Sequence, residues 1–209
     1  MERARSLNTA FARRARPASR LVIALAIVAA IGTLPRAAEA DEALWNLLRG
    51  GGQVVMIRHG ATDGTVGDPP GFRLDDCATQ RNLVDKGRDD ARRLGRTFAA
   101  RSIPVTRVLS SQWCRCLETA RLAFGRAEVW PPLHSNFRDI QTFPVRTREV
   151  RAQIGGWRGE GNLVLVSHAI LIRAFIGLFP VEGELIVLTP EGGETFRVAG
   201  RILPGELDD

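Results

Sequence analysis

The sequence predicts an α/β fold built on a mostly parallel sheet. Residues 53–58 and 162–167 each contain a short, continuous apolar run with β-branched members, which is typical of strands buried on both faces. Segments such as 83–101 lie between them, and their apolar positions are spaced for one face of a helix. Strands that alternate with helices favour a parallel sheet covered by helices.

The other expected elements follow in chain order. A short helix is expected at 41–49, closed by Gly50-Gly51-Gly52. The segment 60–82 is rich in Gly, Asp and Pro, and so long an irregular loop is usually functional or disordered; we favour a functional one. Ser110-Ser111 is expected to cap the helix after the strand 105–109. The remaining expected elements are helices at 112–124, 149–155 and 169–178, and strands at 128–129, 185–188 and 195–199.

The first 40 residues have the pattern of a secretory signal peptide. An arginine-rich stretch ends at Arg20, the apolar run 21–31 follows, and Ala38-Glu39-Ala40 places small residues where a signal peptidase cuts. The apolar run is shorter than the roughly 20 residues of a membrane-spanning helix. We therefore predict a signal peptide at 1–40, a mature domain at 41–209 and a periplasmic or secreted bacterial protein; an uncleaved leader anchored in the inner membrane is the alternative.

The positive charge of the chain belongs mainly to this leader. The formal net charge is +6, but outside residues 1–40 the chain keeps 22 of its 29 basic and 21 of its 23 acidic residues. A nearly neutral mature domain lacks the basic surface that nucleic-acid binding requires. We therefore expect no nucleic-acid partner.

Three cysteines remain, at 77, 114 and 116. In an oxidising compartment one disulfide and one free thiol are expected. Cys114 and Cys116 are two positions apart and would point away from each other, so a bridge from Cys77 to one of them is favoured. We expect no metal site, because the sequence has no CxxC or HExxH pattern and its three histidines are far apart.

Chemistry-bearing residues follow three of the expected strands. His59 comes after the first apolar run, His168 comes after the run 162–167, and the strand 105–109 is followed by the segment 110–120. Ligands of open α/β sheets bind where the strands end at their carboxyl side. If the strands are parallel neighbours, the three endings converge on one rim.

At these positions the sequence resembles the histidine phosphatase (phosphoglycerate mutase-like) superfamily. The marks of that family are an Arg-His-Gly triplet, a Ser-Ser-x-x-x-Arg-x-x-x-Thr-Ala helix start and a Ser-His pair. They stand here as Arg58-His59-Gly60, as 110–120 with Arg115 as its arginine, and as Ser167-His168. The resemblance spans nearly all of the mature chain and implies the three-layer α/β/α sandwich of the superfamily.

The resemblance also implies a role for each residue. Neutral His59 would be the nucleophile that forms a phosphohistidine, which water later hydrolyses. Arg58 and Arg115 would hold the phosphate dianion with planar, bidentate donors, and Gly60 would let it approach the backbone. His168 would bind the transferring oxygens and stabilise their charge in the transition state. No cofactor is implied.

The general acid is less well defined. Many members carry a glutamate in a Leu-x-Glu pattern, and here Ser135 stands at that position. Asp139 is our first candidate for the acid, and Asp75 and Asp76 in the long loop are the alternatives; each is equally compatible with a surface aspartate. His134 matches no motif and is expected at the surface.

The segment 71–83 resembles the corresponding loop of exported members, including those similar to lipopolysaccharide core heptose phosphatases. Arg73 and Arg81 in this loop are candidates for holding the substrate, and pairing with neighbouring aspartates is the alternative. We therefore expect an exported, metal-independent phosphomonoesterase that acts on a phosphorylated small molecule or envelope glycan. The alternative is a catalytically weak envelope protein that binds phosphate or sugar phosphates.

Overall fold

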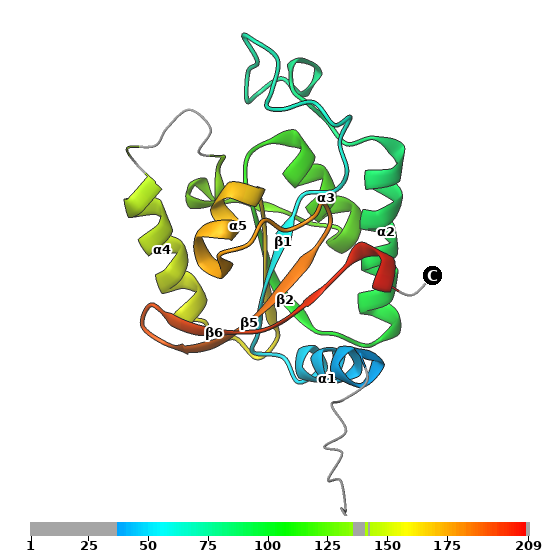
Figure 1. Cartoon of the computed structure of the whole chain (residues 1–209), viewed down its shortest axis with the longest axis vertical. Helices are drawn as coiled ribbons and strands as arrows, with labels where there is room; N and C mark the ends of the chain where they lie inside the picture. Colours follow the sequence, from blue (N-terminus) through cyan, green and yellow to red (C-terminus); the bar gives the residue numbers. More distant parts are fainter. Residues whose placement is uncertain (1–36, 136–140, 142, 208–209) are drawn as a thin grey trace, which may run out of the picture. The chain divides into compact units, whose positions relative to one another are not determined.

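The computed structural model describes residues 37–135, 141 and 143–207 (Figure 1). The chain divides into two units at 34/35, and the described residues belong to the second. Its helices are α1 (Ala37–Arg49), α2 (Asp85–Ala100), α3 (Cys114–Phe124), α4 (Phe143–Gly155) and α5 (Ala169–Ile176). Its strands are β1 (Val54–Arg58), β2 (Val105–Ser110), β3 (Glu128–Val129), β4 (Asn162–Ser167), β5 (Leu185–Gly192) and β6 (Thr195–Ile202).

The predicted leader lies almost wholly outside the described residues, so the signal peptide stays a prediction. In the part of the chain that the structure describes, no helix has the length and apolar character needed to cross a membrane.

The prediction of a mostly parallel sheet is confirmed. Six strands lie in the order β3-β2-β4-β1-β5-β6, and the first four of these run parallel to one another. β5 and β6 are antiparallel and form the other end of the sheet. Strand β4 lies between β1 and β2, so the three strands that precede the motif residues are immediate neighbours.

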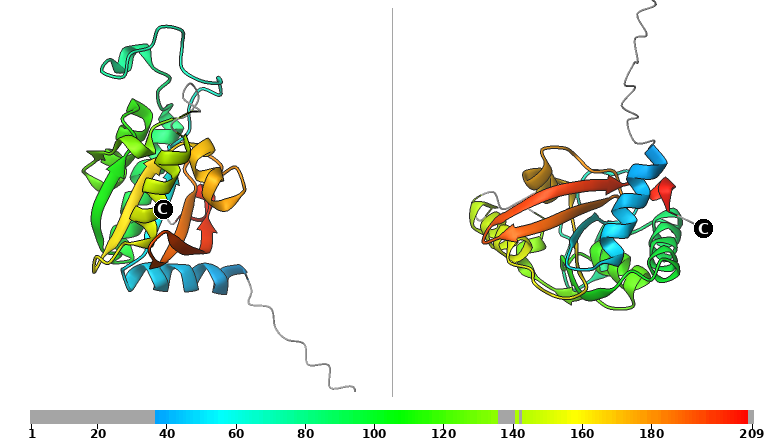
Figure 2. Two further views of the ribbon diagram at one scale, coloured as in Figure 1. Left: turned by 90° about the vertical axis from the view of Figure 1, so that its left-hand side faces the viewer. Right: turned by 90° about the horizontal axis from the view of Figure 1, so that it is seen from below.

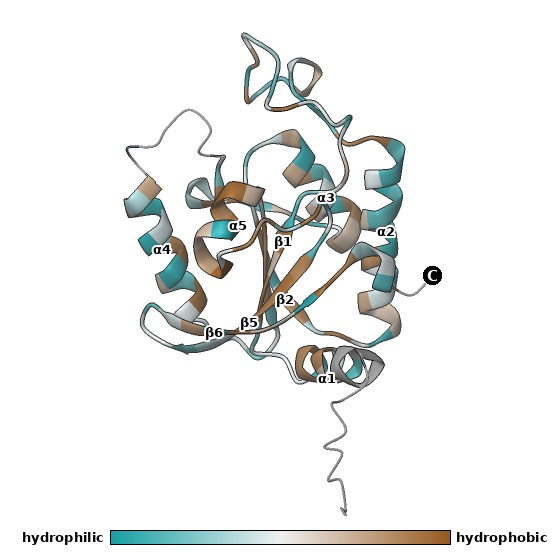
Figure 3. Cartoon of the chain, in the orientation of Figure 1, coloured by the Kyte–Doolittle hydropathy of each residue, from teal (hydrophilic) through white to brown (hydrophobic). Residues whose placement is uncertain are grey.

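Two hydrophobic cores, one on each face of the sheet, make the fold a three-layer sandwich. Alternate residues of β1 point to opposite faces, as strand geometry requires: Val55 and Ile57 belong to one core, Val54 and Met56 to the other. The first core is covered by α1, α2 and α3, and the second by α4 and α5 (Figure 2). Most of the sheet is coloured as hydrophobic in Figure 3, whereas α2 shows a largely hydrophilic surface.

Two boundaries differ from the sequence prediction for clear physical reasons. Helix α4 begins at Phe143 rather than 149, because Pro144 stands in its first turn, where the missing proline N–H costs no helical hydrogen bond. Helix α3 begins at Cys114 with Trp113 at its N-cap, which makes no side-chain capping bond. The expected cap by Ser110-Ser111 is therefore wrong. Ser110 still belongs to β2.

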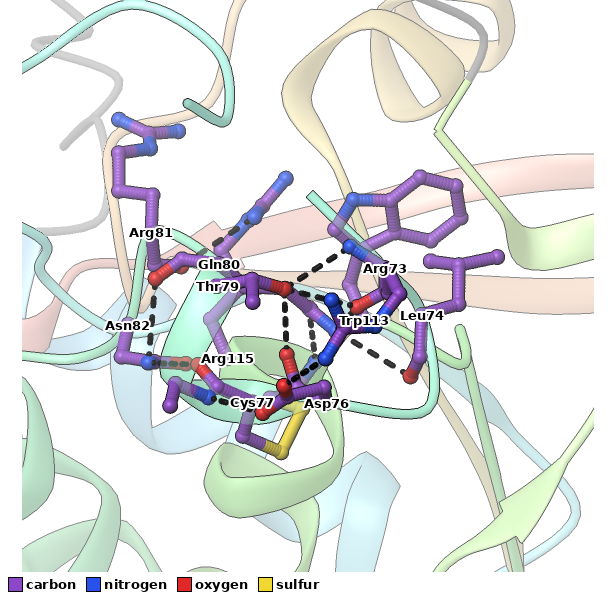
Figure 4. Close-up of a disulfide and its surroundings, with 12 residues drawn as sticks. Arg73, Leu74, Asp76, Cys77, Thr79, Gln80, Arg81, Asn82, Trp113 and Arg115 are labelled. Carbon is purple, nitrogen blue, oxygen red and sulfur yellow. Dashed lines mark hydrogen bonds and ion pairs between the residues drawn. A yellow bond between two sulfur atoms is a disulfide. The ribbon is translucent and has the colours of Figure 1, made fainter. Parts of the chain in front are cut away.

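The long loop after β1 is fastened to α3. Its 3₁₀ turn Cys77–Thr79 carries the disulfide Cys77–Cys114, with 5.7 Å between the two Cα atoms (Figure 4). The prediction that Cys77 pairs with one of the other two cysteines is confirmed, and Cys116 is the free, buried thiol. Gln80 adds a second link: its Nε2 donates to the Arg73 carbonyl (2.9 Å), and its Oε1 accepts from the Cys114 N–H (3.0 Å).

Candidate active site

His59 follows β1 directly, and the residue is 2% exposed. Its Nδ1 lies 2.9 Å from the Gly60 carbonyl oxygen. A carbonyl can only accept, so Nδ1 carries the hydrogen and Nε2 keeps a free lone pair. Burial, followed by the positive charge of Arg115, lowers the pKa of His59 to about 3. The ring is therefore neutral at physiological pH, as a nucleophile must be.

His168 follows β4, the parallel neighbour of β1, and the two imidazole centroids are 5.5 Å apart. The Oγ of Ser111 lies 2.9 Å from Nε2 of His168, and the Trp113 N–H points to the same Oγ at 3.5 Å. Both ring nitrogens of His168 therefore have a polar neighbour, Ser111 Oγ at Nε2 and the guanidinium of Arg115 at Nδ1. Burial, and then the neighbouring His59, lowers the pKa of His168 well below its ordinary value.

Two arginines flank the histidine pair. Arg115, in the first turn of α3, is 3% exposed, and its Nη2 lies 3.5 Å from Nδ1 of His168. Arg58, the last residue of β1, donates from Nη1 to the Pro180 carbonyl at 2.9 Å. The structure therefore brings together the four residues whose convergence the sequence predicted.

Three guanidinium groups lie in the wall of one pocket. Arg58, Arg81 and Arg115 all belong to its lining. Their fixed positive charge and planar N–H donors favour an anionic ligand with several acceptor oxygens.

These side chains lie in the wall of one pocket of about 940 Å³. Besides Arg58, His59, Arg81, Arg115 and His168, the described residues that line it are Gly64, Thr65, Val66, Gly67, Asp68, Phe72, Leu74, Trp113, His134, Ser135, Arg146, Ala169, Ile170, Val181 and Glu182. Among the described residues no group of three potential ligands could hold a metal ion. The pocket thus combines an uncharged imidazole with fixed positive charge.

Sequence comparison agrees with this geometry. Residues 54–143 match the family described as histidine phosphatase superfamily (branch 1), a range that contains Arg58, His59 and Arg115. The matched part of the chain belongs to the histidine phosphatase superfamily. No curated protein matches the sequence.

Solved structures show the same fold at low sequence identity. The protein histidine phosphatase SixA complexed with tungstate is 20% identical, with a TM-score of 0.50 over 75% of this chain and 99% of SixA. The protein TTHB049 from Thermus thermophilus is 18% identical, with a TM-score of 0.52 over 72% of this chain and 99% of that one. The Rv3214 protein from Mycobacterium tuberculosis is 17% identical, with a TM-score of 0.51 over 70% and 95% of the two chains.

Two carboxylates in the pocket were not predicted from the sequence. Asp68, in the long loop, accepts from Nη1 of Arg115 (2.7 Å), from Nε1 of Trp113 (2.9 Å) and from the Arg81 N–H (3.1 Å). Burial works to raise the pKa of Asp68, but the hydrogen bonds and charge of Arg115 outweigh it and lower the pKa. The ionised Asp68 therefore holds the Arg115 guanidinium in place.

Glu182, in the loop before β5, does the same for Arg58. Its Oε1 accepts from Nη2 of Arg58 at 3.3 Å and from the Thr62 hydroxyl at 2.8 Å. No sequence motif marks Glu182, because its partners lie about 120 residues earlier in the chain. Arg58 and Arg115 thus each have a carboxylate partner supplied by a loop.

The structure places Gly60 outside the pocket lining, as far as the described residues define it. Its N–H donates to the Thr119 hydroxyl at 3.0 Å. A Cβ at position 60 would lie 2.8 Å from the Gly87 carbonyl oxygen of α2. Close packing of the two backbones therefore explains why position 60 has no side chain. Contact of Gly60 with a substrate stays a prediction.

The structure does not bring the other loop candidates to the pocket. Arg73 is 62% exposed at its side chain, pairs with Asp76, and has Asp75 at 4.0 Å. Asp76 Oδ1 also caps the 3₁₀ turn by accepting from the Ala78 N–H at 3.0 Å. Asp139 lies outside the described residues. Arg81, in contrast, does line the pocket.

His134 is part of the pocket wall, so its expected surface position is wrong. It is half-buried, and its ring centroid lies 5.5 Å from that of Trp113 in an edge-to-face arrangement. Burial, and then the charge of Arg146, lowers the pKa of His134 to about 4. Ser135, which stands at the position of the family glutamate, also lines the pocket.

The lowered pKa values of the three histidines make the free energy of unfolding depend on pH. The unfolded chain binds protons at them below about pH 6.5, whereas the folded chain keeps His59, His134 and His168 neutral to much lower pH. Their contribution to stability is therefore complete above about pH 6.5 and falls as the pH drops, by up to about 1.4 kcal/mol per pH unit for each histidine.

Chemical denaturation at several pH values between about 5 and 7.5 measures this slope while most carboxylates remain ionised. The variant His134→Gln is expected to show a shallower slope than the wild type, because one of the three proton-binding sites is removed. Equal slopes for the two proteins would contradict the low pKa of His134.

Proposed function

We propose that this protein is a metal-independent phosphomonoesterase that acts through a phosphohistidine on His59. The observation that carries the proposal is the neutral His59 ring, which keeps a lone pair on Nε2 and lines one pocket with the guanidinium groups of Arg58, Arg81 and Arg115. Nucleophile and anion site are thus combined in one pocket. Phosphoryl transfer depends mainly on such positioning and charge stabilisation.

In the first step the phosphate dianion binds the N–H groups of Arg58, Arg81 and Arg115. Nε2 of His59 attacks phosphorus, so a P–N bond forms as the P–O bond to the leaving group breaks with its electron pair. Negative charge on the phosphoryl oxygens is stabilised by the arginines and by a ring N–H of His168. The Gly60 carbonyl holds the hydrogen on Nδ1 of His59 and stabilises the positive charge on its ring.

In the second step water attacks the phosphoryl group from the side that the leaving group has vacated. The P–N bond breaks, inorganic phosphate leaves, and the lone pair returns to Nε2 of His59. No redox change occurs in either step, and the proton released by water balances the proton taken up by the alkoxide.

A general acid would protonate the leaving group as it departs. Asp68 and Glu182 are carboxylates in the pocket lining, and each accepts hydrogen bonds from an arginine, which suits a base rather than an acid. We keep Asp139 as the proposed general acid; Asp75 and Asp76 lie outside the pocket lining. Without such an acid, substrates with good leaving groups such as aryl phosphates are favoured.

We further propose export to the periplasm or cell exterior after removal of residues 1–40. The Cys77–Cys114 disulfide supports this location, because structural disulfides persist in oxidising compartments. A phosphorylated small molecule or envelope glycan would be available there.

The test is hydrolysis of phenyl phosphate by the purified protein in the presence of excess EDTA. We expect release of inorganic phosphate at a rate that EDTA does not change. Binding of phosphate without turnover would instead favour a phosphate-binding envelope protein of the same fold, the alternative supported by the pairing of both pocket carboxylates. Loss of activity in EDTA, restored by a divalent cation, would overturn metal independence.

A further inference from the structure

The pocket lining combines buried charged groups with exposed apolar ones. Arg115, His59 and His168 are buried, whereas three apolar side chains of the same lining are exposed. These are Val66 in the long loop, 86% exposed, Ile170 in the first turn of α5, 39% exposed, and Val181 before β5, 50% exposed; we call them the rim. Single exposed apolar residues are common on any protein, but these three come from separate elements and share one pocket.

Aromatic side chains form a wall of the same pocket. The indole of Trp113 lies 5.4 Å from the His168 ring and 5.5 Å from the His134 ring, measured between centroids. The Phe72 ring lies 6.1 Å from the same indole, and Leu74 is also in the lining. The wall next to His168 is therefore aromatic and apolar.

The pocket volume of about 940 Å³ is far larger than a phosphoryl group needs, and is at the upper end of the range for drug-sized ligands. An apolar ring that covers Val66, Ile170 and Val181 gains free energy in proportion to the surface it removes from water. Sugar hydroxyls placed against the same side chains would lose their hydrogen bonds to water without replacement.

We infer that this histidine phosphatase acts on phosphate esters whose leaving group carries an aromatic or comparably apolar ring, bound between the Trp113 wall and the rim of Val66, Ile170 and Val181. The inference rests on the proposed function and names the substrate class for the same pocket. Thr65 and Ser135, the hydroxyl side chains of the lining, would serve polar edges of that ring system.

Two matched pairs of compounds test the inference. Phenyl and 2-naphthyl phosphate have leaving groups of similar basicity, so a difference in kcat/KM reports apolar contact rather than intrinsic reactivity. Phenylphosphonate and 2-naphthylphosphonate are not hydrolysed, so titration calorimetry compares the same two rings without turnover. In both pairs we expect the naphthyl compound to be preferred by about tenfold, the gain from burying one further ring.

Serine substitutions locate the contact. In the double variant V66S/V181S the naphthyl preference is expected to fall to about twofold, because two of the three rim side chains lose their apolar surface. The control is V129S/V198S, which changes two exposed valines, at 44% and 42%, in β3 and β6 outside the pocket lining. It is expected to keep the full preference.

Each outcome decides between the inference and the proposed function. Equal affinity for the two phosphonates, or a preference that V66S/V181S leaves intact, overturns the inference even if phenyl phosphate is hydrolysed. Naphthyl preference in calorimetry without hydrolysis of either ester supports the apolar site and overturns the phosphatase proposal. If neither phosphonate binds, the apolar site is overturned, and hydrolysis of phenyl phosphate then decides the proposed function separately.

Discussion

The variant His59→Asn is expected to lose phosphatase turnover almost completely. Asparagine preserves a polar, uncharged side chain next to the Gly60 carbonyl, but its amide nitrogen has no lone pair available for attack on phosphorus. Removal of a nucleophile on which both chemical steps depend lowers kcat by on the order of 10⁴-fold or more. Steady-state hydrolysis of phenyl phosphate measures the loss.

A label distinguishes the nucleophile from a residue that merely supports the site. Rapid acid-free quenching of wild-type protein with a ³²P-labelled aryl phosphate is expected to trap an acid-labile, base-stable label, as phosphohistidine requires. The label should be absent from His59→Asn and present in His134→Asn, which replaces another histidine of the pocket wall. Label retained in His59→Asn would show that a different residue takes up the phosphoryl group.

Loss of the disulfide is expected to have the largest effect on stability. The bond joins residues 37 positions apart, and the loop-entropy relation for a ring of that size gives about 4 kcal/mol of stabilisation. That amount is a large fraction of the roughly 5–15 kcal/mol typical of a domain. We therefore expect the double variant Cys77→Ser/Cys114→Ser to unfold at a markedly lower denaturant concentration than the wild type.

Reduction supplies the control for this comparison. Dithiothreitol is expected to lower the midpoint of wild-type unfolding nearly to that of the double variant, and to leave the double variant unchanged. Cys116→Ala should remain sensitive to the reductant, because Cys116 is buried, takes no part in the bond, and has a thiol pKa raised to about 12 by burial. An unchanged midpoint in reduced wild type would contradict the expected stabilisation.

The part of the site that could be predicted from sequence is the part that the sheet builds. Strands β1 and β4 are continuous apolar runs, and such runs pack as parallel neighbours, so the histidines that follow them had to meet at one edge. Arg115 follows from the third strand in the same way, because β2 pairs with β4. Local periodicity and one rule of sheet topology were enough for these residues.

The loop residues were beyond the same reasoning. Asp68 lies 47 positions from Arg115, in a segment without hydrophobic period, and nothing in the sequence indicates which aspartate of that loop turns inward. The loop candidates that were named, Asp75 and Asp76, instead lie near Arg73, away from the pocket. Side chains delivered by irregular backbone are positioned by tertiary contacts, here by the disulfide and the hydrogen bonds of Gln80.

The close approach of Gly60 and Gly87 limits which substitutions the protein can accept during evolution. A Cβ at position 87 would lie 2.3 Å from the Ala61 carbonyl oxygen, just as one at 60 would meet Gly87. Both obstacles are main-chain atoms, so no repacking of side chains relieves them, and either alanine variant must shift α2 against the segment that carries His59. Selection for new substrates can therefore vary the rim of the pocket freely, while the crossing behind the nucleophile admits only glycine.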